Sequence, residues 1–291
     1  MLITQSFRPD HLLRNVIDNY LYVKAELENP YTDYSFLPKV NQQLSFNLGL
    51  EKTIFDLDNQ EYIPSDILIG QNNRTWRIKV FNGMHRLIVN LKPLGWFKLF
   101  EVPAHRYINR TCNLITLFGT KISPFIHQLR ECQDAKKQIK LLDVFFLELL
   151  EKQGNCKNLE MAVKLIHEAK GNITVNQLER EVFITRRSLE RYFLEQTGLY
   201  PKMYTRIVRF NETIKYLEKN QKPYWPYFTN GLGYCDQSHF INEFQHFAGC
   251  APTRYFDQPW ALRRRLNPDF CHFFTIFHSK GILAYSPTKL N

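Results

Sequence analysis

The stretch ITVNQLEREVFITRRSLERYFLEQTGLYPKMY, residues 173–204, decides how the C-terminal part of this chain folds. Five of its residues recur 51 positions later, within FTNGLGYCDQSHFINEFQHFAGCAPTRYF, residues 228–256. The first copy contains Leu189, Phe193, Gly198, Pro201 and Tyr204. The second contains, at the same spacing, Phe240, Phe244, Gly249, Pro252 and Tyr255. Landmarks that recur at one fixed offset are typical of a repeated supersecondary unit.

Each landmark has a physical role in a helical unit. The two apolar residues lie four positions apart, on one face of a helix, and pack inward. The glycine permits a left-handed conformation at the helix end, and the proline opens the next helix. Thr185 and Asp236 precede the apolar landmarks at the positions of N-caps. Since a short helix and a tight turn precede each N-cap, the repeat predicts two helix-turn-helix units.

Residues 201–219 join the two units and have a helical pattern. A helix of this length spans about 28 Å, at about 1.5 Å per residue. A rigid spacer of that size holds two recognition helices about 34 Å apart, which is one DNA turn, so that they enter successive major grooves. The spacing therefore predicts a domain that binds duplex DNA.

Residues 159–256 resemble the DNA-binding domain of AraC/XylS-type transcription regulators. The two stretches quoted above carry the resemblance, including the closing G-x-x-P-x-x-Y pattern. Glu179 and Thr229 replace the small residue that is usual in the first helix of each unit. Pro226 lies inside the first helix of the second unit, where only the first turn tolerates it.

The resemblance also implies which side chains read bases. By position they are Arg187, Glu190 and Arg191 in the first unit, and Gln237, Ser238 and Asn242 in the second. Arginine pairs with guanine, glutamine or asparagine with adenine, and glutamate with cytosine. Arg186 and the N-terminal turn at Thr185 are placed for phosphates. The alternative is an exposed helix face whose charges are simply solvated.

The N-terminal part contains short runs with strand character between residues 20 and 92, and Asn82-Gly83 predicts a hairpin between two of them. Residues 11–119 resemble a sensor-like domain that precedes the DNA-binding module in some AraC-type regulators, through FLPKVNQQLSFNLG, ILIGQNNRTW and LIVNLKPLGWFKLFEVPAHRYINRTCNLITLFG. We expect the interior of this domain to bind an effector, whose identity the resemblance does not imply. The candidates are polar side chains inside apolar strands, Asn47, Arg86 and Asn90, which alternatively face solvent.

These patterns predict the fold class and its division into domains. We expect an α+β N-terminal domain over residues 1–120, built as a small β-barrel or curved sheet with helices. A helical linker or dimerisation segment follows over 121–156. An all-α domain with two helix-turn-helix units joined by a long helix occupies 157–256. A C-terminal tail, 257–291, includes Arg263, Arg264 and Arg265, which either touch phosphate or are solvated.

Charge and cysteine usage limit the classes of function. The net charge is +10, and seven of the ten excess positive charges lie after residue 156. Such a cluster fits a polyanionic partner, or merely a basic solvated surface. The six cysteines occur singly, which is typical of reduced thiols in a cytoplasmic protein. We find no signal-peptide pattern and no apolar run long enough to span a bilayer, so we expect no membrane partner.

Three classes of function compete. We expect a sequence-specific transcription regulator whose N-terminal domain is controlled by a small-molecule effector or a partner. Double-stranded DNA is its main partner, with a homodimer and RNA polymerase as further ones. The alternative is a helix-turn-helix module that binds proteins instead of DNA, which Glu190, Asp236 and Glu243 near the expected DNA face favour. For an enzyme we find no catalytic motif, cofactor motif or metal-ligand cluster, and a reactive thiol at Cys112 or Cys271 is the remaining route.

Overall fold

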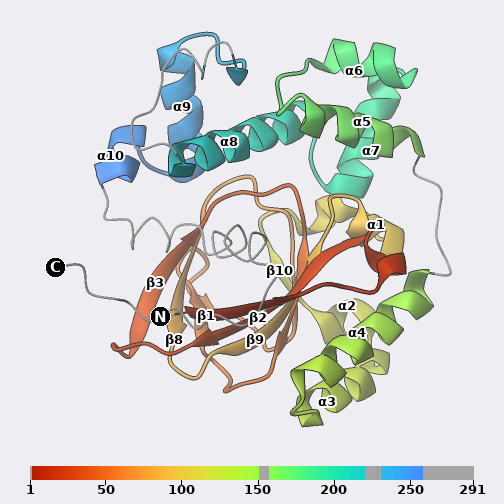
Figure 1. Cartoon of the computed structure of the whole chain (residues 1–291), viewed down its shortest axis with the longest axis vertical. Helices are drawn as coiled ribbons and strands as arrows, with labels where there is room; N and C mark the ends of the chain where they lie inside the picture. Colours follow the sequence, from red (N-terminus) through yellow and green to blue (C-terminus); the bar gives the residue numbers. More distant parts are fainter. Residues whose placement is uncertain (1, 151–156, 220–227, 229–230, 258–291) are drawn as a thin grey trace.

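The structure is a computed structural model that describes residues 2–150, 157–219, 228 and 231–257. A sheet-rich N-terminal domain is followed by a helical C-terminal domain, as the sequence predicts (Figure 1). The C-terminal tail, the residues at Pro226 and Thr229, and most of the segment 151–158 that links the domains lie outside the described residues. In the described part of the chain, no helix has the length and apolarity needed to cross a bilayer.

The N-terminal domain contains two antiparallel sheets. The first has the order β1 (Leu2–Phe7), β2 (Ile17–Ala25), β9 (His85–Leu91), β4 (Gln43–Asn47), β7 (Ile67–Ile69) and β10 (Thr111–Asn113). The second has the order β3 (Tyr31–Phe36), β8 (Trp76–Phe81), β5 (Ile54–Asp56) and β6 (Glu61–Tyr62). The strands therefore form two curved sheets and not one closed barrel.

Side-chain alternation along the strands places an apolar layer between the two sheets. Leu21 and Val23 of β2 contribute to it from the first sheet, and Ile78 and Val80 of β8 contribute from the second. Residues two apart on a strand point to the same face, so both pairs lie on the inward face. The interior of the domain is therefore the space between the sheets.

The hairpin predicted at Asn82-Gly83 is wrong. Gly83 does adopt the left-handed conformation of a tight turn, with φ of +83°. However, β8 pairs with β3 and β5 in the second sheet, whereas β9 pairs with β2 and β4 in the first. The turn carries the chain from one sheet to the other because the inward faces of β8 and β9 form opposite walls of the same interior. Turn chemistry specifies the reversal but not the pairing partner.

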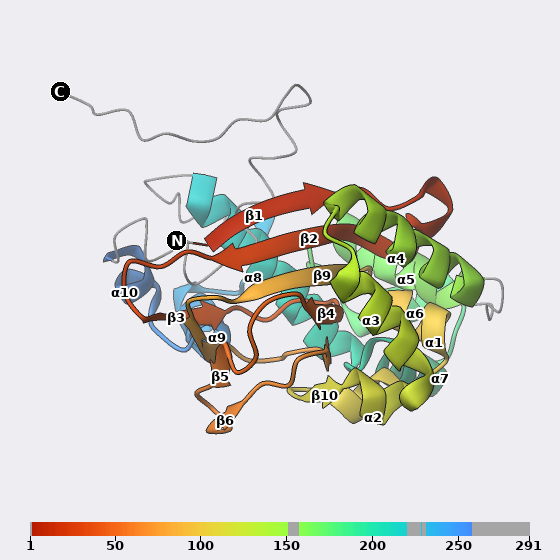
Figure 2. The same ribbon diagram turned by 90° about the horizontal axis from the view of Figure 1, so that it is seen from below.

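Helices cover one side of the N-terminal domain (Figure 2). They are η1 (His11–Leu13), α1 (Gly95–Phe100), η2 (Ala104–Tyr107), α2 (Leu114–Phe118), η3 (Thr120–Ile122), α3 (Ser123–Glu131) and α4 (Ala135–Leu150). Leu142 and Phe146 of α4 are fully buried in the core that the first sheet also lines. The Asp143 carboxylate accepts hydrogen bonds from the Asp10 amide (3.0 Å) and the Tyr20 hydroxyl (2.8 Å). The apolar face of α4 thus packs within the chain.

The C-terminal domain contains six described helices. They are α5 (Lys157–Glu168), α6 (Val175–Val182), α7 (Arg186–Thr197), α8 (Pro201–Lys219), α9 (Gln237–Ala248) and α10 (Pro252–Asp257). All apolar and tyrosine landmarks of the repeat are at most 1% exposed. Gly198 and Gly249 end α7 and α9 with φ of +86° and +72°, as expected of left-handed C-caps. The landmarks of the repeat therefore take equivalent places in α7 and α9, whereas the expected first helix of the second unit lies mostly outside the described residues.

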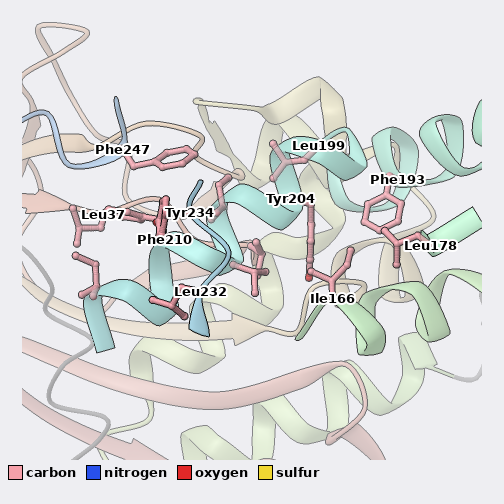
Figure 3. Close-up of a cluster of buried hydrophobic side chains, with 14 of the residues drawn as sticks. Leu37, Ile166, Leu178, Phe193, Leu199, Tyr204, Phe210, Leu232, Tyr234 and Phe247 are labelled. Atoms are coloured by element: carbon pink, nitrogen blue, oxygen red, sulfur yellow. The ribbon is translucent and has the colours of Figure 1, made fainter. Parts of the chain in front are cut away.

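The two domains are in direct contact. Leu37, Val40 and Leu94 of the N-terminal domain belong to the same buried cluster as the C-terminal core, and Figure 3 shows Leu37 within it. Gln42 Nε2 donates to the Thr197 carbonyl at the end of α7 (3.2 Å). Thr75 Oγ1 donates to the Phe247 carbonyl near the end of α9 (2.5 Å). Each of the helices α7 and α9 is therefore attached near its C-terminal end to the N-terminal domain.

Candidate nucleic-acid interface

Helix α7 has one face buried and the opposite face in solvent. Thr185 caps it, and its Oγ1 accepts a hydrogen bond from the Ser188 amide (3.4 Å). Leu189 and Phe193 are fully buried, which fixes the rotation of the helix about its axis. Arg187 and Arg191 are exposed on the other side. Burial of the landmarks thus presents these two predicted base-reading arginines outward.

Arg186 and Glu190 are coupled to each other on the same helix. Arg186 Nε donates to Glu190 Oε1 at 3.0 Å, one helical turn away. This exposed pair neutralises itself locally, and such pairs contribute little to stability. Among the described residues, Arg187 has no such acidic partner. Of the residues predicted in this unit, Arg187 therefore offers the guanidinium with the fewest competing contacts.

Helix α9 presents uncharged polar side chains. The Asp236 carboxylate caps the helix by accepting from the His239 amide (2.8 Å), which confirms its predicted position as an N-cap. Gln237, Ser238 and Asn242 are all exposed on the first turns. The Asp236 carboxylate is thus engaged in a hydrogen bond with the backbone at the N-terminus of α9. Its negative charge also interacts favourably with the positive end of the α9 helix dipole.

Glu243 does not lie on the exposed face where the sequence placed it. It is 3% exposed and accepts from Arg206 Nε (2.9 Å), Arg209 Nε (3.0 Å) and Arg209 Nη2 (3.1 Å). Both arginines belong to α8, so this carboxylate connects α8 to α9. The helix period puts Glu243 beside the buried Phe244, which turns it inward. Glu243 therefore forms a structural ion pair, and its charge is not placed to repel DNA.

A basic cleft lies between the two units. Its volume is about 710 Å³, and the start of α6, one side of α8 and one side of α9 line it. Lys202, Arg206, His239 and His246 contribute basic groups, and Asn242 contributes an amide. Glu243, the acidic residue of this lining, already pairs with two arginines. The cleft thus has a positive character along α8 and beside α9, and such a surface attracts phosphates.

The sequence did not single out the cleft residues on α8. Lys202 and Arg206 are four residues apart, a spacing that places them on one helix face. The signal for these residues is therefore this basic spacing within the spacer helix, residues 201–219. Figure 1 shows α7 and α9 at opposite ends of α8, and the basic residues of α8 line the same cleft as α9.

The three predicted effector residues are all buried. The Asn47 side chain bonds to the carbonyls of Gly49 and Leu50, so it shapes a turn. Asn90 accepts from Gln43 and donates to Asn19, both at 2.6 Å. Arg86 alone of the three lines a cavity between the sheets. Of the three, Arg86 therefore lines a cavity, whereas Asn47 and Asn90 make hydrogen bonds that stabilise the local structure.

The cysteine considered for a reactive role is in an unfavourable setting. Burial raises the pKa of the Cys112 thiol, which disfavours the nucleophilic thiolate. Cys271 lies outside the described residues, as do Arg263, Arg264 and Arg265. No group of three potential metal ligands occurs in the part of the chain that the structure describes.

Comparisons with known proteins match both parts of the chain. Residues 178–258 match a family model described as a helix-turn-helix domain. Residues 5–113 match a domain of unknown function, DUF6597. No curated protein matches the chain.

Solved structures of one protein match most of the chain at low sequence identity. A structure of ToxT from Vibrio cholerae has 12% identity and a TM-score of 0.43, over 88% of this chain and 97% of that chain. ToxT bound to (E)-4-(8-methylnaphthalen-1-yl)but-3-enoic acid has 16% identity and a TM-score of 0.42, over 87% and 98%. ToxT bound to an unsaturated fatty acid has 14% identity and a TM-score of 0.40, over 89% and 96%.

The buried repeat, the capped helices and the matched family model define the C-terminal domain as a DNA-binding helix-turn-helix domain. The match confirms, for this part of the chain, the resemblance to AraC-type DNA-binding domains that was found in the sequence.

Proposed function

We propose that this protein is a transcription regulator that recognises a specific duplex DNA sequence by placing α7 and α9 in successive major grooves. The outward orientation of the predicted base-reading residues carries the proposal. Arg187, Arg191, Gln237, Ser238 and Asn242 are exposed, while the landmarks on the opposite helix faces are buried. The 19 residues of α8 separate the two helices by about 28 Å at about 1.5 Å per residue.

The two units contribute differently to binding. The first unit supplies arginine side chains, which pair with guanine and attract phosphates. The second supplies neutral amide and hydroxyl groups, and its cap carries the Asp236 carboxylate. The first unit therefore provides most of the affinity, and the second refines the sequence preference. Thr185 and Arg186 hold phosphates, together with Lys202 of the basic cleft.

The N-terminal domain controls this activity through an effector bound in its interior. The cavity between the sheets supports this assignment, because Arg86 lines it. RNA polymerase is the further partner that such a regulator engages at a promoter. The burial of Glu243 weakens the argument for a protein-interaction module, since this carboxylate does not face the DNA side.

Selection of bound DNA from a random pool tests the proposal. We expect a motif with two elements about one helical turn, or about 10 base pairs, apart. Arg187→Ala should weaken binding to the selected site by about 10- to 100-fold, as the loss of a bidentate base contact implies. Gln237→Ala should cost less. A pool without enrichment would reject the function, and equal or reversed losses would reject the division of roles.

A further inference from the structure

The interior of the N-terminal domain contains a small cavity of about 80 Å³. Apolar side chains of both sheets form most of its wall, including Leu21, Ile67, Ile78 and Val80. Arg86 on β9 is the charged group of this wall. A cation on the wall of an apolar cavity is costly unless an anion accompanies it.

Arg86 has only neutral acceptors as hydrogen-bond partners. It is 3% exposed. Its Nη1 donates to the Ser45 hydroxyl (3.3 Å) and the Ser65 carbonyl (2.7 Å), and its Nη2 donates to the Pro64 carbonyl (3.2 Å). Its Nε is buried and has no partner among the described residues. The guanidinium therefore keeps at least one unused donor, at Nε, and donates to no carboxylate among the described residues.

The carboxylate whose charge acts on Arg86, that of Asp66, also pairs with another arginine. Asp66 accepts from Arg130 Nη2 and from the Asn47 amide (3.1 Å). Burial lowers the pKa of Arg86 to about 10, so the guanidinium remains protonated at neutral pH. Two guanidinium groups thus share one carboxylate. This leaves one uncompensated positive charge, and of the two arginines only Arg86 lies in the apolar interior.

We propose that this cavity binds a short aliphatic monocarboxylate, with its carboxylate on Arg86 and its alkyl chain between the sheets. A monoanion balances the single excess charge, and a guanidinium matches carboxylate geometry. The apolar walls favour an alkyl chain over a fully hydrated anion such as phosphate. The small volume restricts the buried chain to a few carbon atoms. That this ligand is the effector rests on the proposed regulatory function, whereas its binding does not.

The position of the cavity connects it to both recognition helices. Gln43 and Trp76 line the cavity and directly follow Gln42 and Thr75 in the chain. Gln42 and Thr75 are the residues that donate to the carbonyls near the ends of α7 and α9. A ligand in contact with the starts of β4 and β8 therefore acts one residue away from both attachments.

Thermal shift and calorimetric titration of the full chain, without DNA, test the site. The probes are butanoate, hexanoate and octanoate, each compared with the primary alcohol of equal length and with inorganic phosphate. We expect at least one carboxylate to raise the melting temperature, with little effect from its alcohol or from phosphate. Arg86→Met should weaken carboxylate binding by about 10- to 100-fold, the loss of a charge-assisted contact.

Arg77→Met is the matched control. Arg77 is exposed and paired with Asp58 at the surface, so its replacement should leave carboxylate binding unchanged. Arg86→Met removes a buried charge, which favours folding, but it also takes the donor from the Pro64 and Ser65 carbonyls, which disfavours it. If it does not fold, the comparison of carboxylate with alcohol on the unaltered protein still decides.

Equal stabilisation by alcohol and carboxylate, equal binding of phosphate, or no stabilisation by any acid would overturn the inference. Retained binding by Arg86→Met would overturn it as well. DNA binding is measured separately on the selected site. If no carboxylate binds but DNA binding is intact, only the proposed ligand site is rejected. If DNA binding is absent, the proposed function is rejected, and the ligand titration still stands on its own.

Discussion

Among the single residues that the structure describes in the C-terminal domain, Glu243 has the largest set of charged contacts. Its buried carboxylate bonds to two arginines of α8 while Phe244 beside it fills the core. Removing the negative charge leaves Arg206 and Arg209 without their partner. Glu243→Gln should lower the free energy of unfolding by about 2 kcal/mol, less than for a fully buried pair because Arg206 keeps some contact with water.

Urea denaturation checks this value, and Glu190→Gln is the control. Glu190 pairs with Arg186 on an exposed face, so its replacement should change stability by less than about 0.5 kcal/mol. Equal effects of the two substitutions would mean that the α8–α9 connection is as weak as a surface pair.

At the scale of one element, the two C-cap glycines of the repeat differ in their surroundings. Both have positive φ, which costs other residues about 1 kcal/mol. A Cβ on Gly198 would lie 3.3 Å from the Ala104 backbone, whereas one on Gly249 would meet nothing within 4 Å. Gly198→Ala should therefore destabilise by about 2 kcal/mol and Gly249→Ala by about 1 kcal/mol. Thermal melts compare the two, and a larger loss for Gly249→Ala would contradict the difference.

The helical repeat could be predicted from sequence because its determinants are local. An N-cap such as Thr185, an apolar pair and a C-cap such as Gly198 lie within fifteen residues and specify a helix without knowledge of the rest. The same holds for the exposed face of α7, since burial of Leu189 and Phe193 defines it.

Features that depend on distant partners could not be predicted in this way. The turn at Asn82-Gly83 was recognisable, but the pairing of β9 with β2 depends on residues more than sixty positions away. Glu243 looked like a surface charge because its arginine partners lie on another helix. Arg86 was singled out as a polar residue in an apolar strand, yet its neutral partners and the cavity appear only when both sheets are assembled.

At the scale of the whole molecule, the contacts between domains restrain both recognition helices. Thr75→Val removes the donor to the Phe247 carbonyl and keeps the size of the side chain. Gln42→Leu removes the donor to the Thr197 carbonyl. If these bonds preorganise α7 and α9, the double variant should bind the selected DNA about fivefold or more weakly, the usual scale of coupling between sites.

Fluorescence anisotropy with the selected site measures this loss. Gln60→Leu is the control, because Gln60 makes one exposed hydrogen bond to the Leu57 carbonyl within its own turn. Unchanged DNA affinity in the double variant, with its fold intact, would show that the domains contact each other without influencing recognition.

The insertion of Leu37, Val40 and Leu94 into the C-terminal core has a practical consequence for protein engineering. If the chain were cut at the interdomain linker, the isolated C-terminal domain would expose an apolar patch and would tend to aggregate. A fusion of this C-terminal domain with a different N-terminal domain would also have to include the loops that carry those three side chains. The boundary for exchanging domains is therefore the packed interface between them, and it does not correspond to one position in the chain.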